Sequence, residues 1–108
     1  MQDIDVFLDR TARPLFLGAD FTNGPLSNAR VALMGWSIKN LSSSAAAELD
    51  IYNSGSASGD VVFPVTLAGN ESSREWFGPN GILLDSGLAV AVQSGSVSGA
   101  MFVVYLND

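Results

Sequence analysis

Residues 30–40 read RVALMGWSIKN, and this stretch decides the fold. Its side chains alternate between two sides with a period of two, which is the period of a β-strand. We expect one face to carry Met34, Trp36 and Ile38, and the other to carry Val31, Leu33 and Gly35. Both faces are mostly apolar until Ser37 and Lys39. The pattern therefore predicts a central strand that is covered on both sides.

Further strands are expected on either side of this one. Alternation predicts strands from about residue 45 or 46 to residue 52, over residues 60–67, 82–84 and 88–92, and over residues 100–106. Pro64 lies inside the second of these and has no N–H to donate, so this strand is expected at a sheet edge or at a bulge. The run over residues 101–106 is apolar at both parities, which predicts burial on both faces.

Turn-forming residues separate these strands at regular intervals. Residues 53–59 (NSGSASG) are typical of a hairpin loop, and residues 78–81 (GPNG) are typical of a turn. Tight connections are also expected at residues 85–87 and 94–96. Helical patterns are nearly absent. The sequence therefore predicts an all-β fold, an antiparallel β-sandwich of the jelly-roll or immunoglobulin-like class.

The first 27 residues differ from the rest, and we expect the sandwich domain itself to cover residues 28–108. Two apolar patches, residues 6–8 and 15–17, are separated by a polar stretch. In one interpretation they are the first strands of the sandwich. In the other, residues 1 to about 12 form an extended arm that pairs with a neighbouring subunit, which makes Val6, Phe7 and Leu8 candidate partner-binding residues.

Composition excludes several classes of function. Of the 108 residues, 47% are hydrophobic and only 15% are charged, and the net charge is −6. A negative chain is unsuited to nucleic acid or to anionic membrane surfaces. Cysteine is absent, and the acidic first residues do not resemble a signal peptide, so we expect synthesis in a reducing cytoplasm. A surface poor in charge favours burial against protein partners.

The residues needed for catalysis are largely missing, and we expect no enzyme. Without His or Cys there is no ordinary neutral-pH base and no thiolate for attack or for zinc. Two sets of acidic residues are possible sites: Asp3, Asp5 and Asp9 for Ca²⁺, and a sugar-cleaving pair drawn from Glu71, Glu75 and Asp85. Both are expected to be ordinary surface charges. We therefore predict no catalytic, metal or cofactor-binding residues.

Two adjacent aromatic residues precede the residue 78–81 turn. Strand alternation predicts that one of Trp76 and Phe77 faces the core and that the other faces outward or toward a neighbour. An exposed ring beside a turn is suited to a partner's pocket or to stacking on a sugar. Trp76 and Phe77 therefore complete the candidate partner-binding residues, and Trp36 is expected in the core.

From residue 31 to residue 106 the chain resembles small β-sandwich structural proteins of tailed bacteriophages. The resemblance is carried by the stretches WSIKN (residues 36–40), LDIYN (49–53), NESSREWFGPNGI (70–82), SGL (86–88) and SGSVSG (94–99). In that family a Gly-Pro-x-Gly turn is followed by a Gly-Leu strand and a closing Ser-Gly-x-Val-x-Gly hairpin. The motifs rest on turn chemistry, so they indicate a fold more than a function.

This resemblance implies a virion component, made in the cytoplasm of a host bacterium. A capsid decoration or cement protein fits best: a homo-oligomer that binds the major capsid protein or another virion protein. Two alternatives remain. One is a tail, connector or fibre-associated structural protein, and the other is a carbohydrate- or receptor-binding module that uses Trp76 or Tyr105 as its platform.

Overall fold

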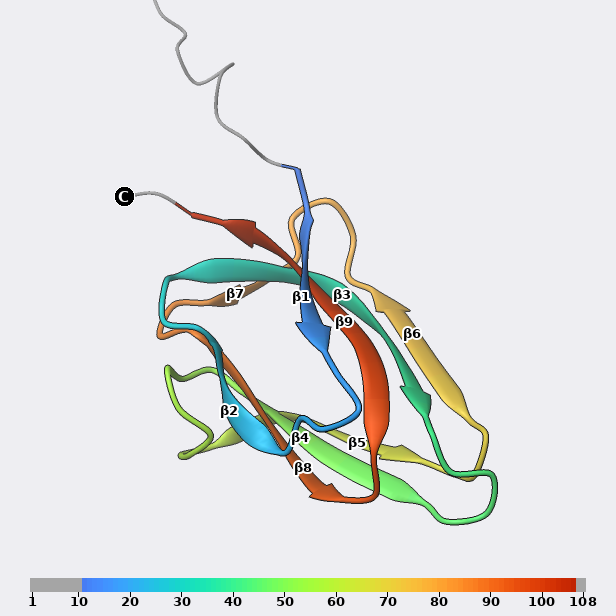
Figure 1. The fold of residues 1–108 in the computed structure, drawn as a ribbon. Helices are drawn as coiled ribbons and strands as arrows, with labels where there is room; N and C mark the ends of the chain where they lie inside the picture. Colours follow the sequence, from blue (N-terminus) through green and yellow to red (C-terminus); the bar gives the residue numbers. More distant parts are fainter. Residues whose placement is uncertain (1–10, 107–108) are drawn as a thin grey trace, which may run out of the picture.

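The computed structural model describes residues 11–106, which form two antiparallel sheets packed face to face (Figure 1). The strands in this range are β1 (Arg13–Leu17), β2 (Asn23–Ser27), β3 (Val31–Asn40), β4 (Ala47–Tyr52), β5 (Val61–Leu67), β6 (Ser72–Trp76), β7 (Ile82–Leu84), β8 (Leu88–Ser94) and β9 (Val97–Tyr105). One sheet, here called the β3 sheet, has the order β1-β9-β3-β6, and β7 also pairs with β3. The other, the β4 sheet, has the order β2-β8-β4-β5. The predicted all-β sandwich is confirmed.

The strand order is that of a jelly roll. The chain crosses between the two sheets at almost every connection, and only β4–β5 and β6–β7 stay within one sheet. An immunoglobulin-like sandwich would instead place β1, β2, β4 and β5 together in one sheet. The residue 94–96 connection also crosses between sheets, from β8 to β9, so the closing hairpin that the phage resemblance implies is absent there.

Strands β6 and β7 act as one interrupted edge strand. Both run antiparallel to β3, with β6 paired to residues 35–39 and β7 to residues 31–33. The Phe77 amide donates to the Met34 carbonyl at 2.9 Å, which continues the ladder to the point where the chain leaves it. Residues 78–81 then form the predicted turn, and the chain rejoins the same partner.

A bulge in β3 corrects the predicted face assignment. The pairing of β3 with β9 shifts register between Leu33 and Gly35, which inserts one extra residue and reverses the alternation. Leu33 and Trp36 consequently share the main core, whereas Met34 lies in a separate cluster on the other face. Gly35 suits this bulge, because a Cβ there would overlap the Glu75 carbonyl.

Proline and register irregularity mark the edge of the β4 sheet. β5 is an edge strand, as Pro64 predicts. The loop between β4 and β5 closes the expected hairpin. Phe63 and Val65 pack against the core and Leu67 lies within it, but Val61 lies beyond a register shift and is exposed, contrary to the predicted common face.

The second N-terminal apolar patch belongs to the sandwich. β1 pairs along β9, with Leu17 in the core and Leu15 packed against it. β2 pairs with β8 in the other sheet. Within the described residues, the sandwich therefore includes β1 from residue 13, so that residues 15–17 lie in a strand.

Three aromatic rings close the side of the sandwich where β5 and β6 face each other. The Trp36 ring meets the Phe63 and Phe77 rings edge-on, at centroid distances of 5.4 and 5.5 Å. Phe63 and Phe77 stack at 5.2 Å, which joins the two sheets. The Trp36 indole N–H is satisfied by the Ser73 hydroxyl at 2.9 Å.

Asn40 fastens the end of β3 to two connections. Its side chain is fully buried, and its amide nitrogen donates to the carbonyls of Ala45 (2.8 Å), Ala68 (3.0 Å) and Leu67 (3.2 Å). Its side-chain oxygen accepts from the Ser42 amide at 2.9 Å. One side chain thus binds backbone groups of both connections.

Candidate interaction surface

The adjacent residues Trp76 and Phe77 point in opposite directions, as alternation predicts. Phe77 packs against the core, whereas Trp76 is 64% exposed. Trp76 lies opposite Gly35, which in turn lies opposite Phe102. Because directly opposed residues share a face, Trp76 and Phe102 stand on the outer side of the β3 sheet. Phe77 is therefore a structural residue, and Trp76 is the one available to a partner.

The candidates Val6, Phe7 and Leu8 lie outside the described residues, so the structure does not bring them together with Trp76. The nearest described part of the N-terminal segment is the exposed pair Thr11 and Ala12, directly before β1.

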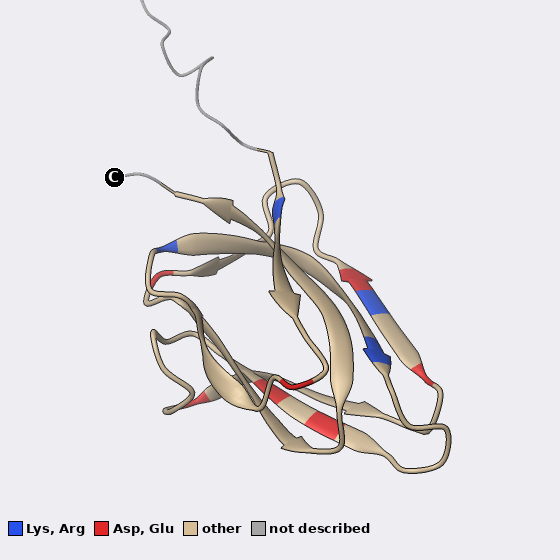
Figure 2. Ribbon diagram, in the orientation of Figure 1, with Lys and Arg blue, Asp and Glu red and all other residues tan. Residues whose placement is uncertain are grey.

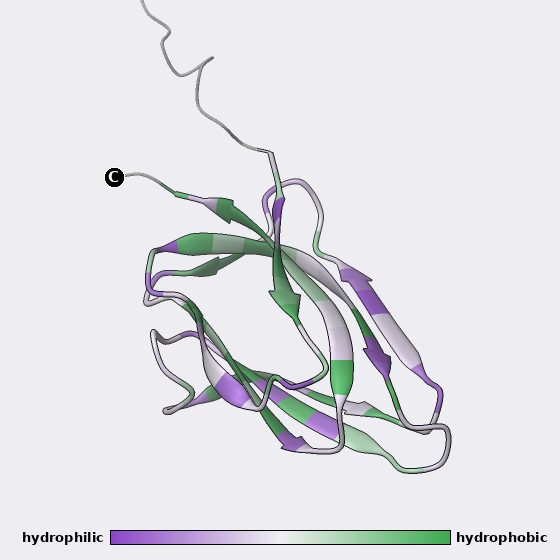
Figure 3. Ribbon diagram, in the orientation of Figure 1, coloured by the Kyte–Doolittle hydropathy of each residue, from purple (hydrophilic) through white to green (hydrophobic). Residues whose placement is uncertain are grey.

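The outer face of the β3 sheet is apolar where a sandwich exposed to water usually carries polar side chains. Strand register places on this face Pro14 and Phe16 of β1, Ala32 and Met34 of β3, Leu83 of β7, and Ala100, Phe102 and Val104 of β9. Figure 3 shows hydrophobic residues continuing from β1 to the last part of β9 and the first half of β3. Phe16 is 75% exposed and Leu83 is 50% exposed.

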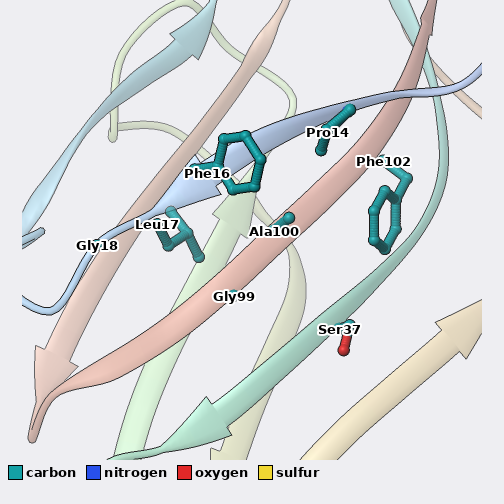
Figure 4. Close-up of a pocket in the computed structure, with 8 residues that line it drawn as sticks. All are labelled: Pro14, Phe16, Leu17, Gly18, Ser37, Gly99, Ala100 and Phe102. Carbon is teal, nitrogen blue, oxygen red and sulfur yellow. The ribbon is translucent and has the colours of Figure 1, made fainter.

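An open groove of about 620 Å³ crosses the β1 end of this face. Its lining consists of Pro14, Phe16, Leu17, Gly18, Ser37, Gly99, Ala100 and Phe102 (Figure 4). Gly99 and Ala100 form the floor of the groove. Position 99 accepts only glycine, because a Cβ there would overlap the Ser37 carbonyl. The Ser37 hydroxyl is the one polar side-chain group among these lining residues. The groove therefore selects apolar side chains.

Basic residues gather at one sheet, where the acids Glu71, Glu75 and Asp85 also lie in or directly beside the strands (Figure 2). Within residues 11–106, the four Lys and Arg residues all lie in or directly beside the β3 sheet: Arg13, Arg30, Lys39 and Arg74. The described strands of the β4 sheet carry acids alone, Glu48 and Asp50. Arg74 stands directly opposite Ser37 on the apolar face. Strand register places Arg74 and Lys39 on this face, which favours partners that combine apolar and acidic groups.

Two of the three candidates for sugar cleavage, Glu71 and Asp85, lie at opposite ends of β3. Glu71 directly precedes β6 beside the Lys39 end of β3, and Asp85 follows β7 beside the Val31 end. Eight residues of strand separate the two ends, or about 26 Å at about 3.3 Å per residue, far beyond the separation of a glycosidase pair. Each also accepts a hydrogen bond, Glu71 from the Ala68 amide at 2.6 Å and Asp85 from the Asn53 amide group at 3.1 Å.

Metal ligands do not converge in the described part of the chain. Across residues 11–106 no group of three or more acidic side chains is placed to hold a metal ion. Asp3, Asp5 and Asp9, considered for Ca²⁺, lie outside the described residues.

Trp76 and Tyr105 do not form a joint stacking platform. Tyr105 lies opposite Val31, whose side chain is in the main core, whereas Trp76 lies on the outer face of the same sheet. Tyr105 is 37% exposed. A sugar ring would therefore meet one of these aromatic residues and not both.

The groove residues Phe16 and Phe102 were not among the residues predicted to bind a partner. The sequence did contain a signal for this surface. Residues 101–106 are apolar at both odd and even positions, although each sheet of a two-layer sandwich has only one side facing the core. Either the odd-numbered or the even-numbered residues therefore had to form an apolar outer face.

Among residues 11–106, no helix has the length and apolar character needed to cross a membrane. Comparison of the chain with protein-family models, with curated proteins and with solved structures gave no match.

Proposed function

We propose that this chain is a structural protein of a tailed-bacteriophage virion, a capsid decoration protein that forms homo-oligomers and binds the major capsid protein or another virion protein. The observation that carries the proposal is the apolar outer face of the β3 sheet. Its exposed residues Phe16, Trp76 and Leu83 come from both edges of that sheet. Such a face gains free energy when another protein covers it, at about 25 cal/mol per Å² of apolar area.

Two further features support a role in binding rather than in chemistry. The jelly roll is a fold shared by viral capsid and lectin domains, which is support by analogy. Among the candidate acids, Glu71 and Asp85 lie at opposite ends of β3. A rigid block of this kind, repeated many times on a particle, stabilises it through many modest contacts.

The contact with the particle is assigned to the Trp76 and Leu83 side of the face. Both side chains project from the interrupted edge strand. The residue 78–81 turn lies between them over Met34, because a Cβ at Gly81 would come within 2.7 Å of the Met34 sulfur. Two large apolar side chains beside a rigid turn resemble the central anchors of protein interfaces.

Replacing Trp76 and Leu83 together with Ser is expected to weaken binding to capsid shells by at least about tenfold, the equivalent of about 1.4 kcal/mol. Binding is measured by co-sedimentation with unexpanded and expanded shells of the same virus. The control is Val62→Ser, which removes an exposed apolar side chain from β5 in the other sheet. Undiminished binding by the double variant, or no binding of the native chain to either shell, contradicts the proposal.

A carbohydrate-binding module is the second candidate, favoured by the 64% exposure of the single Trp76 ring. It predicts binding to a glycan array that is lost in Trp76→Ala and retained in Leu83→Ser. The number of copies per virion separates a decoration protein, present in hundreds, from a tail or connector component, present in about a dozen or fewer.

A further inference from the structure

Neither Trp76 nor Leu83 lines the groove at the β1 end of the apolar face, so the groove is available to a different occupant. Phe16 and Phe102 flank it, and Gly99 and Ala100 leave its floor open. Its volume of about 620 Å³ is in the range of pockets that hold several apolar groups. Arg74 lies opposite Ser37 on the same face, and Lys39 follows two residues further along β3.

The chain itself contains a segment with the matching chemistry. Residues 4–8 read IDVFL, four apolar residues with Asp5 among them, and Asp3 and Asp9 flank the segment. Apolar side chains in this segment match the groove lining, and the three carboxylates match Lys39 and Arg74. Apolar fit and charge complementarity thus point to the same occupant.

The connection to β1 favours a neighbouring copy as the source of the segment. Four residues, 9–12, separate Leu8 from Arg13, and none of them is glycine or proline. Arg13 precedes Pro14, which holds the entry to β1 extended. Thr11 and Ala12 form no turn, so the chain would have to reverse before them to reach its own groove. A neighbouring copy receives the segment without any reversal.

We infer that the groove beside Phe16 binds residues 4–8 of a second copy of this chain, so that N-terminal segments link neighbouring subunits. The inference deepens the proposed function and rests on it in one respect, namely that copies assemble side by side. It gives Val6, Phe7 and Leu8 a specific binding site. Electrostatic contact with Lys39 and Arg74 makes the link weaker at high salt.

Thiol exchange between two variants tests the link, because the native chain has no cysteine. Val6→Cys is loaded with thionitrobenzoate as a mixed disulfide and mixed with Ser37→Cys. The thiolate at position 37 attacks the loaded sulfur, forms the disulfide between the two chains and releases one thionitrobenzoate, which is yellow. Disulfide formation requires the two Cα atoms to approach within about 7 Å. Release is expected to be at least tenfold faster than with Thr66→Cys, on an exposed strand of the other sheet.

Each rate is divided by the rate at which the same cysteine variant reacts with free dithiobis-nitrobenzoate. This normalisation removes differences in intrinsic thiol reactivity between positions 37 and 66. Equal normalised rates for positions 37 and 66 would overturn the inference. The inference would also be overturned if the Val6→Cys, Ser37→Cys double variant, on oxidation, formed its disulfide only within single chains and never between two chains. Fast exchange in a protein that binds no capsid shell would contradict the proposed function alone, and shell binding without exchange would contradict the inference alone.

Discussion

Replacing Asn40 with Asp is expected to destabilise the fold by about 3 kcal/mol or more, enough to remove much of the stability of a small domain. The two side chains have almost the same shape, so packing changes little. The substitution removes the amide group that donates to the carbonyls of Ala45, Leu67 and Ala68. It also places an ionised oxygen against those carbonyls, at a position with no exposed surface.

Urea unfolding followed by far-ultraviolet circular dichroism measures the loss. The matched control is Asn80→Asp, the same chemical change at an exposed turn residue, which is expected to shift the free energy of unfolding by about 0.5 kcal/mol or less. A midpoint for Asn40→Asp equal to that of the control would show that the buried amide does not hold the two connections together.

The chain's two tryptophans are expected to differ sharply when each is replaced with Ala. Trp36→Ala is expected to cost about 4 kcal/mol, since it empties a core site, breaks two ring contacts and leaves the Ser73 hydroxyl without its partner. Trp76→Ala is expected to change stability by only about 0.5 kcal/mol, because that ring is mostly in water.

Each variant retains a single tryptophan, so fluorescence reports on one environment at a time. The Trp76→Ala protein should emit at short wavelength from the buried Trp36 and shift to long wavelength on unfolding. Equal losses of stability in the two variants would mean that Trp76 supports the fold, and the interaction surface would lose its principal residue.

The fold class was predictable because period-two patterns and turn residues are local signals. Pro64 marked an edge strand correctly, and the residue 53–59 loop closes a hairpin as expected. The predicted faces of β3 were wrong because the alternation reverses at one point, the bulge between Leu33 and Gly35. A bulge is set by how β3 pairs with β9, and the isolated sequence around Gly35 gives no sign of where that pairing shifts.

The candidate surface was predictable in part for a similar reason. Alternation was enough to separate Trp76 from Phe77, since both follow one strand. The groove, however, brings together Phe16 and Phe102, which are 86 positions apart in the sequence and become neighbours only because β1 lies along β9. Pairing between distant strands is the information that a sequence pattern lacks.

The interrupted edge strand makes the molecule open to modification at one point. Because β6 and β7 are each anchored on β3, the length of the excursion between them does not alter strand order or register. Foreign peptides inserted between Pro79 and Asn80, which are both exposed, would extend from the surface while the β-sandwich keeps its structure. Because Trp76 and Leu83 flank this turn, such grafts are expected to leave the strands paired and to block the proposed contact with the particle.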